Sequence, residues 1–120
     1  MKVLITGANR GLGYELSRVY AEGGHEVYAG VLEAADYSEL KALKEKYPEL
    51  TILPMDVTNR EQVIEAAKVC GELDVLINVA GILCKSDHTL AITEADPADL
   101  MLALDVNVMG NAHVIYAFHK

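Results

Sequence analysis

The sequence has no tryptophan, one phenylalanine, three prolines and two cysteines in 120 residues. The two cysteines, Cys70 and Cys84, form neither a disulfide framework nor the paired Cys-x-x-Cys motif of a zinc site, so we expect both thiols to be reduced and to lie in the core. No tract rich in Pro, Gly or Ser divides the chain. We therefore expect one compact domain, because this length is too short for two.

Basic residues are also scarce, with 10 Lys and Arg against 18 Asp and Glu, for a formal net charge of −8. No basic run is present to neutralise a phosphate backbone, so we expect no nucleic-acid partner. No segment approaches the ~20 apolar residues that span a bilayer, and the apolar start of the chain is shorter than that of a signal peptide. We therefore expect a cytoplasmic protein that binds no membrane. The four histidines have no ligand-like spacing, and no metal site is predicted.

The sequence does contain a regular alternation of strand-like and helical segments. Apolar runs predict buried strands at 3–6, 26–32, 51–55 and 73–78. Apolar residues at helical spacing predict helices from 12 to the Gly23-Gly24 pair, from a capping box at Asp36 to Pro48, from a capping box at Thr58 through 69, and from Asp96-Pro97 to the last residue. This order predicts a Rossmann-type α/β fold of three layers, α/β/α, with a doubly wound parallel sheet of which only the first half, in strand order 3-2-1-4, is present.

The last predicted helix is apolar on nearly all sides and has no residue that would end it. One sheet cannot contact all of its apolar residues, which are Leu100, Met101, Leu102, Leu104, Val106, Val108, Met109, Ala112, Val114, Ile115 and Phe118. We therefore expect a missing C-terminal half, a second copy of the chain, or both to cover this helix. The fourth strand would also present an edge, so a homo-oligomer formed through the helix or this edge is expected.

A glycine-rich segment, Thr6-Gly7-Ala8-Asn9-Arg10-Gly11-Leu12-Gly13, joins the first strand to the first helix. Backbone N–H groups and the helix dipole at such a junction can hold a pyrophosphate. Gly7 would permit the sharp turn, Gly11 the approach of phosphates, and Gly13 the close packing of helix on strand. A P-loop would need Lys at position 13, so a kinase or GTPase is disfavoured. A tight turn without a ligand is the alternative interpretation.

A second segment of small residues, Asn78-Val79-Ala80-Gly81, ends the fourth predicted strand. Its small side chains leave room for a ribose, and the amide of Asn78 can join adjacent strand ends. The alternative interpretation is a strand exit with a satisfied buried amide.

Together with Asp56-Val57 after the third strand and Asn107 in the last helix, these motifs resemble the short-chain dehydrogenase/reductase family over the whole chain. The resemblance implies that the glycines hold NAD(P), that Asp56 contacts the adenine, and that the Asn78–Gly81 segment lines both riboses. Asn107 matches the tetrad asparagine that organises a water in the proton relay; a structural amide is the alternative. Val79 departs from the family, which more often has Asn there. The residues expected to bind the dinucleotide are Thr6, Gly7, Asn9, Arg10, Gly11, Leu12, Gly13, Leu32, Asp56, Val57, Asn78, Val79, Ala80 and Gly81.

The family's catalytic Ser and Tyr-x-x-x-Lys pair have no counterpart in the chain. Tyr37 and Lys41 have the right spacing, but they belong to the second helix, and we interpret them as a coincidence. We therefore expect residues 1–120 to be an NAD(P)-binding domain truncated before these groups, which lacks the proton donor for an alcohol/carbonyl substrate and acts on it only within a complete protein. A non-catalytic dinucleotide-binding or protein-interaction module is the alternative.

The choice between NAD and NADP depends on the end of the second strand, where an acid favours NAD and Arg favours NADP. Leu32 stands there and is neither. Glu33 would serve NAD only if the strand ended two residues later. Arg10 in the glycine segment is able to pair with a 2′-phosphate, and it favours NADP.

Overall fold

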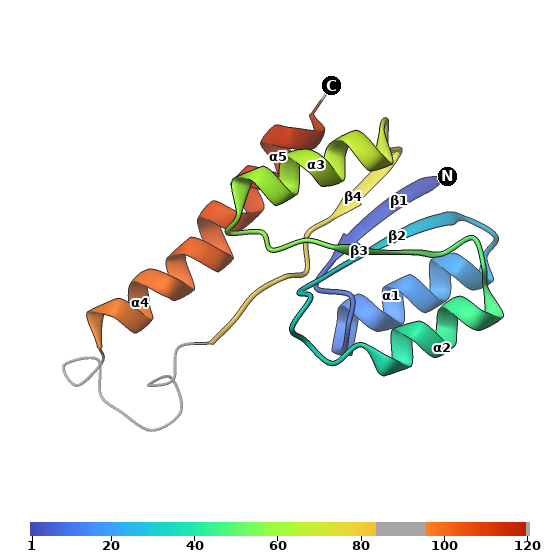
Figure 1. The fold of residues 1–120 in the computed structure, drawn as a ribbon, viewed down its shortest axis with the longest axis horizontal. Helices are drawn as coiled ribbons and strands as arrows, with labels where there is room; N and C mark the ends of the chain where they lie inside the picture. Colours follow the sequence, from blue (N-terminus) through green and yellow to red (C-terminus); the bar gives the residue numbers. More distant parts are fainter. Residues whose placement is uncertain (84–95, 120) are drawn as a thin grey trace.

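The computed structural model describes residues 1–83 and 96–119 (Figure 1). Cys84, His88 and the predicted loop through Thr93 therefore lie outside the described residues. The elements are β1 Lys2–Thr6, α1 Gly11–Glu22, β2 Glu26–Val31, α2 Ser38–Lys46, β3 Thr51–Pro54, α3 Arg60–Cys70, β4 Val75–Ile77, α4 Pro97–Leu104, the π-helix η3 Asp105–Gly110 and α5 Asn111–Phe118. The strands form one sheet in the order β3-β2-β1-β4, all parallel, as predicted.

The strands lie at the centre of a three-layer structure, in which α1 and α2 cover one face of the sheet and α3 and α5 cover the other (Figure 1). Successive side chains of β1 point to opposite faces, so both faces are apolar. Val3 and Ile5 pack in the core under α1 and α2, and Leu4 packs in the core under α3 and α5. Cys70 is buried in this second core, where burial raises the pKa of its thiol to about 11.

The cap residues of the first three helices agree with the predicted ones or differ from them by one residue. Gly23 caps α1, and Gly24 takes the left-handed conformation (φ 81°) that glycine favours. The predicted N-caps of the next two helices are each one residue early: α2 has Tyr37 at this position and α3 has Asn59. The hydroxyl of Thr58 instead donates to the Asp56 carboxylate at 2.7 Å, which leaves Asn59 to accept from the first turn of α3.

The last helical segment begins as predicted, because the Asp96 side chain accepts from the Ala98 N–H at 2.9 Å and Pro97 occupies the first turn. The prediction of one uninterrupted α-helix to the last residue was wrong. The segment passes through the π-helix and ends at Phe118. Gly110, the last residue of the π-helix, packs so closely on Val57 that a Cβ atom there would lie 2.6 Å from Val57 Cγ2, which leaves room only for glycine.

Most of this last segment is not covered by the rest of the described chain. In Figure 1, α4 extends beyond the sheet. Apolar side chains exposed along α4, η3 and α5 are Met101, Leu102, Leu104, Val108, Met109 and Ile115. By length and composition alone, Pro97–Phe118 is also the one helix among the described residues that could cross a membrane, so the expectation that no segment approaches these criteria was wrong. Core helices of soluble proteins meet the same two criteria.

Candidate functional site

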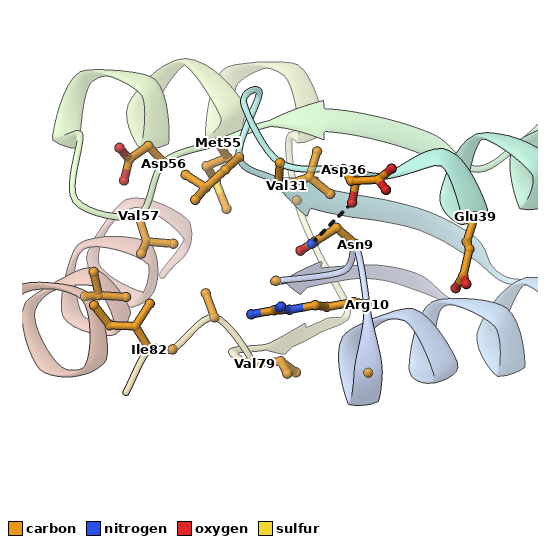
Figure 2. A pocket seen from close by; sticks show the side chains of 18 of the residues that line it. Asn9, Arg10, Val31, Asp36, Glu39, Met55, Asp56, Val57, Val79 and Ile82 are labelled. Atoms are coloured by element: carbon orange, nitrogen blue, oxygen red, sulfur yellow. Dashed lines mark hydrogen bonds between the residues drawn. The ribbon is translucent and has the colours of Figure 1, made fainter. Parts of the chain in front are cut away.

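A cleft of about 740 Å³ lies at the carboxyl ends of the strands (Figure 2). It is lined by Gly7, Asn9, Arg10, Gly11, Gly30, Val31, Leu32, Ala35, Asp36, Ser38, Glu39, Met55, Asp56, Val57, Val79, Ala80, Gly81, Ile82 and Val106. β1 has β2 on one side and β4 on the other, so the chain order reverses at β1. Ligands of open α/β sheets bind at such a switch point.

The turn after β1 is shaped by two glycines. Gly7 has a left-handed backbone (φ 63°), and a Cβ atom on it would lie 2.9 Å from the backbone of Ala80. A Cβ atom on Gly13 would lie 2.1 Å from the carbonyl oxygen of Gly7. The roles predicted for Gly7 in the turn and Gly13 in helix packing are therefore confirmed.

The first turn of α1 presents free backbone donors to the cleft. Arg10, the N-cap residue, has an extended backbone and makes no side-chain cap, and the first turn holds no acidic residue. A Cβ atom built on Gly11 would have no other atom within 4 Å among the described residues, so the space beside this backbone is open. Uncapped N–H groups at the positive end of a helix dipole attract anions, and this turn has room for a phosphate to approach them.

The wall between the glycine turn and the segment after β4 is held by Thr6. Its buried hydroxyl oxygen accepts hydrogen bonds from the backbone N–H groups of Val79 (3.0 Å) and Ala80 (3.1 Å). The prediction had given this role to Asn78, but the buried side-chain oxygen of Asn78 has no hydrogen-bond partner among the residues that the structure describes. The strand ends are therefore joined through Thr6, whose side chain faces β4 across the sheet.

Asp56 and Val57 form the far wall of the cleft, after β3. The Asp56 carboxylate accepts from both the backbone N–H (2.9 Å) and the hydroxyl of Thr58 (2.7 Å), which fixes its orientation. Val57 is buried against Gly110, and its carbonyl oxygen lies 3.1 Å from His113 Nδ1. Contacts with α3 and with the last helical segment thus set the position of this wall.

Asn107, in the π-helix, forms two hydrogen bonds with the backbone of Ile82. Its Oδ1 accepts from the Ile82 N–H and its Nδ2 donates to the Ile82 carbonyl, both at 2.8 Å. The side chain of Asn111 also donates to the carbonyl oxygen of Asn107 at 2.8 Å. The Oδ1 and Nδ2 atoms of Asn107 each have a partner, so this side chain joins the cleft wall to the helix and does not line the cleft itself.

The charges around the cleft differ from those predicted. β2 ends at Val31, so the condition under which Glu33 would serve NAD is not met. Two other acids, Asp36 and Glu39, line the cleft beyond Leu32. Hydrogen bonds from Ser38, its backbone N–H first, lower the pKa of Asp36. In Figure 2 the Arg10 guanidinium points across the cavity, away from both acids.

Of the residues predicted from the motifs, ten line the cleft: Gly7, Asn9, Arg10, Gly11, Leu32, Asp56, Val57, Val79, Ala80 and Gly81. Thr6 and Gly13 support the wall from behind. Asn78 and the exposed Leu12 do not line the cleft. Lys41 stacks over the Tyr37 ring at 4.8 Å, and neither lines the cleft, in agreement with a coincidental motif. Asp36 and Glu39 were missed, because the spacing of Asp36 was interpreted only as a helix cap.

A four-stranded parallel sheet with a glycine turn at its switch point defines a Rossmann-type α/β domain. The family model described as short chain dehydrogenase matches residues 1–120. The chain belongs to the short-chain dehydrogenase family of oxidoreductases.

Individual relatives agree in sequence and in structure. Short-chain dehydrogenase fogD of Aspergillus ruber is 35% identical over 122 residues, which cover 97% of this chain and 40% of that protein. The crystal structure of NADPH-bound carbonyl reductase from chicken fatty liver superposes with a TM-score of 0.86 at 29% identity and covers 98% of this chain and 46% of that one. The closed form of serine dehydrogenase complexed with NADP+ gives a TM-score of 0.86 at 27% identity over 99% of this chain and 48% of that one. The chain thus spans less than half the length of these three proteins.

Proposed function

We propose that this chain supplies the dinucleotide-binding part of an NAD(P)-dependent oxidoreductase that acts on an alcohol/carbonyl pair. The observation that carries the proposal is the cleft, which brings together the glycine turn, Asp56 and the Val79–Gly81 segment from three different strand ends. Its volume is within the ~300–1,000 Å³ of typical ligand sites.

The residues of the cleft fit the parts of a dinucleotide in order. The uncapped first turn of α1 and Gly11 suit the pyrophosphate, and Asp56 suits the adenine. Val79, Ala80 and Gly81 leave space for the nicotinamide ribose. When bound there, a nicotinamide dinucleotide donates or accepts a hydride.

Arg10 favours NADP over NAD within this proposal. It lines the cleft, is exposed, and forms no ion pair with another described residue, so its guanidinium is available for a phosphate. Both the carbonyl reductase and the serine dehydrogenase named above were solved with NADPH or NADP+.

Asn107 would act in a complete protein as the tetrad asparagine of the family. Its paired amide holds Ile82, a residue of the cleft wall, against the last helical segment. A residue fixed in this way can keep a neighbouring water in place for a proton relay. The proton donor itself, a Tyr activated by a nearby Lys, is not among the residues of the cleft.

A second function, a module that binds a dinucleotide or a protein without catalysis, is favoured by one observation. The apolar side chains exposed along α4, η3 and α5 suit a protein interface, including one between two copies of the chain.

Isothermal titration of the 120-residue chain with NADPH and NADH, beside a carbonyl-reduction assay with a panel of aldehydes and ketones, tests the proposal. We expect binding without turnover, with NADPH bound more tightly. Replacing Gly13 by Ala should abolish binding, because its Cβ would collide with the Gly7 carbonyl. Turnover by the chain alone would show that the missing Tyr and Lys are dispensable, and absence of binding would leave the protein-interaction module.

A further inference from the structure

The far wall of the cleft, Asp56 and Val57, belongs to a loop between β3 and α3. Asp56 is attached to the start of α3 on both sides of its backbone. Its N–H donates to Gln62 Oε1 at 2.9 Å, and its carbonyl accepts from the Asn59 N–H at 2.9 Å. Its carboxylate accepts from Thr58. These bonds fix Asp56 on α3, but none of them reaches the carbonyl of Val57.

The Val57 carbonyl is held by His113, a residue of α5. His113 Nδ1 lies 3.1 Å from the carbonyl oxygen in a partly buried contact. A carbonyl oxygen only accepts, so Nδ1 carries the hydrogen and donates it. Among the described residues, no other donor forms a hydrogen bond with this carbonyl. Gly110 packs against the Val57 side chain from the same helical segment, which lies next to Val57 in Figure 2.

The last helical segment also holds the wall that follows β4. Asn107 forms two hydrogen bonds of 2.8 Å with the backbone of Ile82, which lines the cleft. Asn107 and His113 therefore connect residues from two different strand ends to one segment. The relative position of Ile82 and Val57 depends on both of these side chains.

We infer that His113 is a positioning residue, which holds the Val57 carbonyl so that Asp56 and Val57 present a fixed edge to the adenine. The inference rests on the proposed function, since it requires that the adenine binds at this wall. The wall offers an acceptor, the Asp56 carboxylate, and a donor, the Val57 N–H, which has no acceptor among the described residues. Adenine presents an amino donor beside a ring-nitrogen acceptor, and hypoxanthine presents the reverse pattern, a carbonyl oxygen beside a ring N–H.

Titrations of the full chain with NADP+ and with nicotinamide hypoxanthine dinucleotide phosphate, which differ only in the base, test this role. We expect the unaltered chain to bind NADP+ more tightly. His113→Leu removes the donor and should lower the ratio of the two affinities by about tenfold, because a hydrogen bond to a charged group contributes at least that much. His113→Asn, whose Nδ2 takes the place of Nδ1, should restore the ratio.

His119→Leu is the matched control. Its Nδ1 also contacts a carbonyl oxygen, that of Tyr116, and neither residue lines the cleft. His119→Leu should leave the ratio unchanged even where urea denaturation shows a loss of stability, because both dinucleotides bind the same folded chain. If His113→Leu does not fold, His113→Phe provides a second side chain without a donor.

Each other result has a definite meaning. An unchanged ratio in the donor-free variant, with both dinucleotides bound, overturns the role of His113 and leaves the proposed function intact. A fall in the ratio that His113→Asn does not recover overturns it as well, because the hydrogen bond is then not the cause. Equal affinity of the unaltered chain for both dinucleotides also overturns it, since the wall then does not recognise the base. If the unaltered chain binds neither, the proposed function fails and the role of His113 fails with it.

Discussion

A single hydroxyl, that of Thr6, joins the ends of two neighbouring strands at the cleft. It accepts from two backbone N–H groups, those of Val79 and Ala80, and is itself buried. Gly7, the next residue, packs against the same Ala80 backbone, which excludes a Cβ atom. The shape of the cleft between β1 and β4 therefore depends on Thr6, which does not line the cleft, as well as on Gly7 and Ala80, which do.

Replacing Thr6 by Val should lower the free energy of unfolding by about 1–3 kcal/mol, because two N–H groups lose their acceptor while the shape of the side chain is kept. Thr6→Ser retains the hydroxyl and serves as the control, with a smaller loss from the missing methyl group. Urea denaturation measures both. Equal stability of Thr6→Val and the unaltered chain would contradict the role given to the hydroxyl.

Two neighbouring polar residues before α3, Thr58 and Asn59, have different hydrogen-bond partners. Asn59, and not Thr58, accepts from the first turn of α3, since Thr58 holds the Asp56 carboxylate. The same few residues thus end β3, shape the far wall of the cleft and begin α3.

Asn59→Ala should destabilise the chain by about 1 kcal/mol, because the N–H of Gln62 loses its acceptor. Asn59→Ser, which provides another good N-cap, should recover most of the loss. The check is the midpoint of urea denaturation followed by circular dichroism. If Asn59→Ala and Asn59→Ser are equally destabilised, the side chain of Asn59 is not the cap.

Element types were predictable from the sequence because apolar spacing reports burial directly. The run Val3–Thr6 and the pair Gly23-Gly24 fixed a strand and a helix end correctly. The exact caps were not predictable, because adjacent residues such as Thr58 and Asn59 both carry suitable oxygens and tertiary contacts decide between them. The π-helix was not predicted either, and within it Gly110 packs against Val57, a tertiary contact that apolar spacing does not report.

At the scale of the whole molecule, the sequence predicted which strand ends form the cleft but not its charge. Parallel strands bring their carboxyl ends to one edge, so the order of the motifs was sufficient to place Gly7, Asp56 and Ala80 together. Asp36 reaches the cleft through the path of the loop after β2, which spacing alone does not define. The sequence therefore could not predict that acidic side chains line the cleft, because their position depends on the path of this loop.

The apolar surface of α4, η3 and α5 should make the isolated chain associate, because water-exposed Leu104 and Ile115 gain from mutual burial. We expect the mean mass in sedimentation equilibrium to rise with concentration. The double variant Leu104→Lys with Ile115→Lys should shift this rise to higher concentration. Val19→Lys adds a charge at a similarly exposed apolar site on α1, in the opposite layer, and should have little effect. If the double variant associates as strongly as the unaltered chain, the contact lies elsewhere, and the edge of β4 becomes the surface to test, because its unpaired backbone groups can bind a second strand.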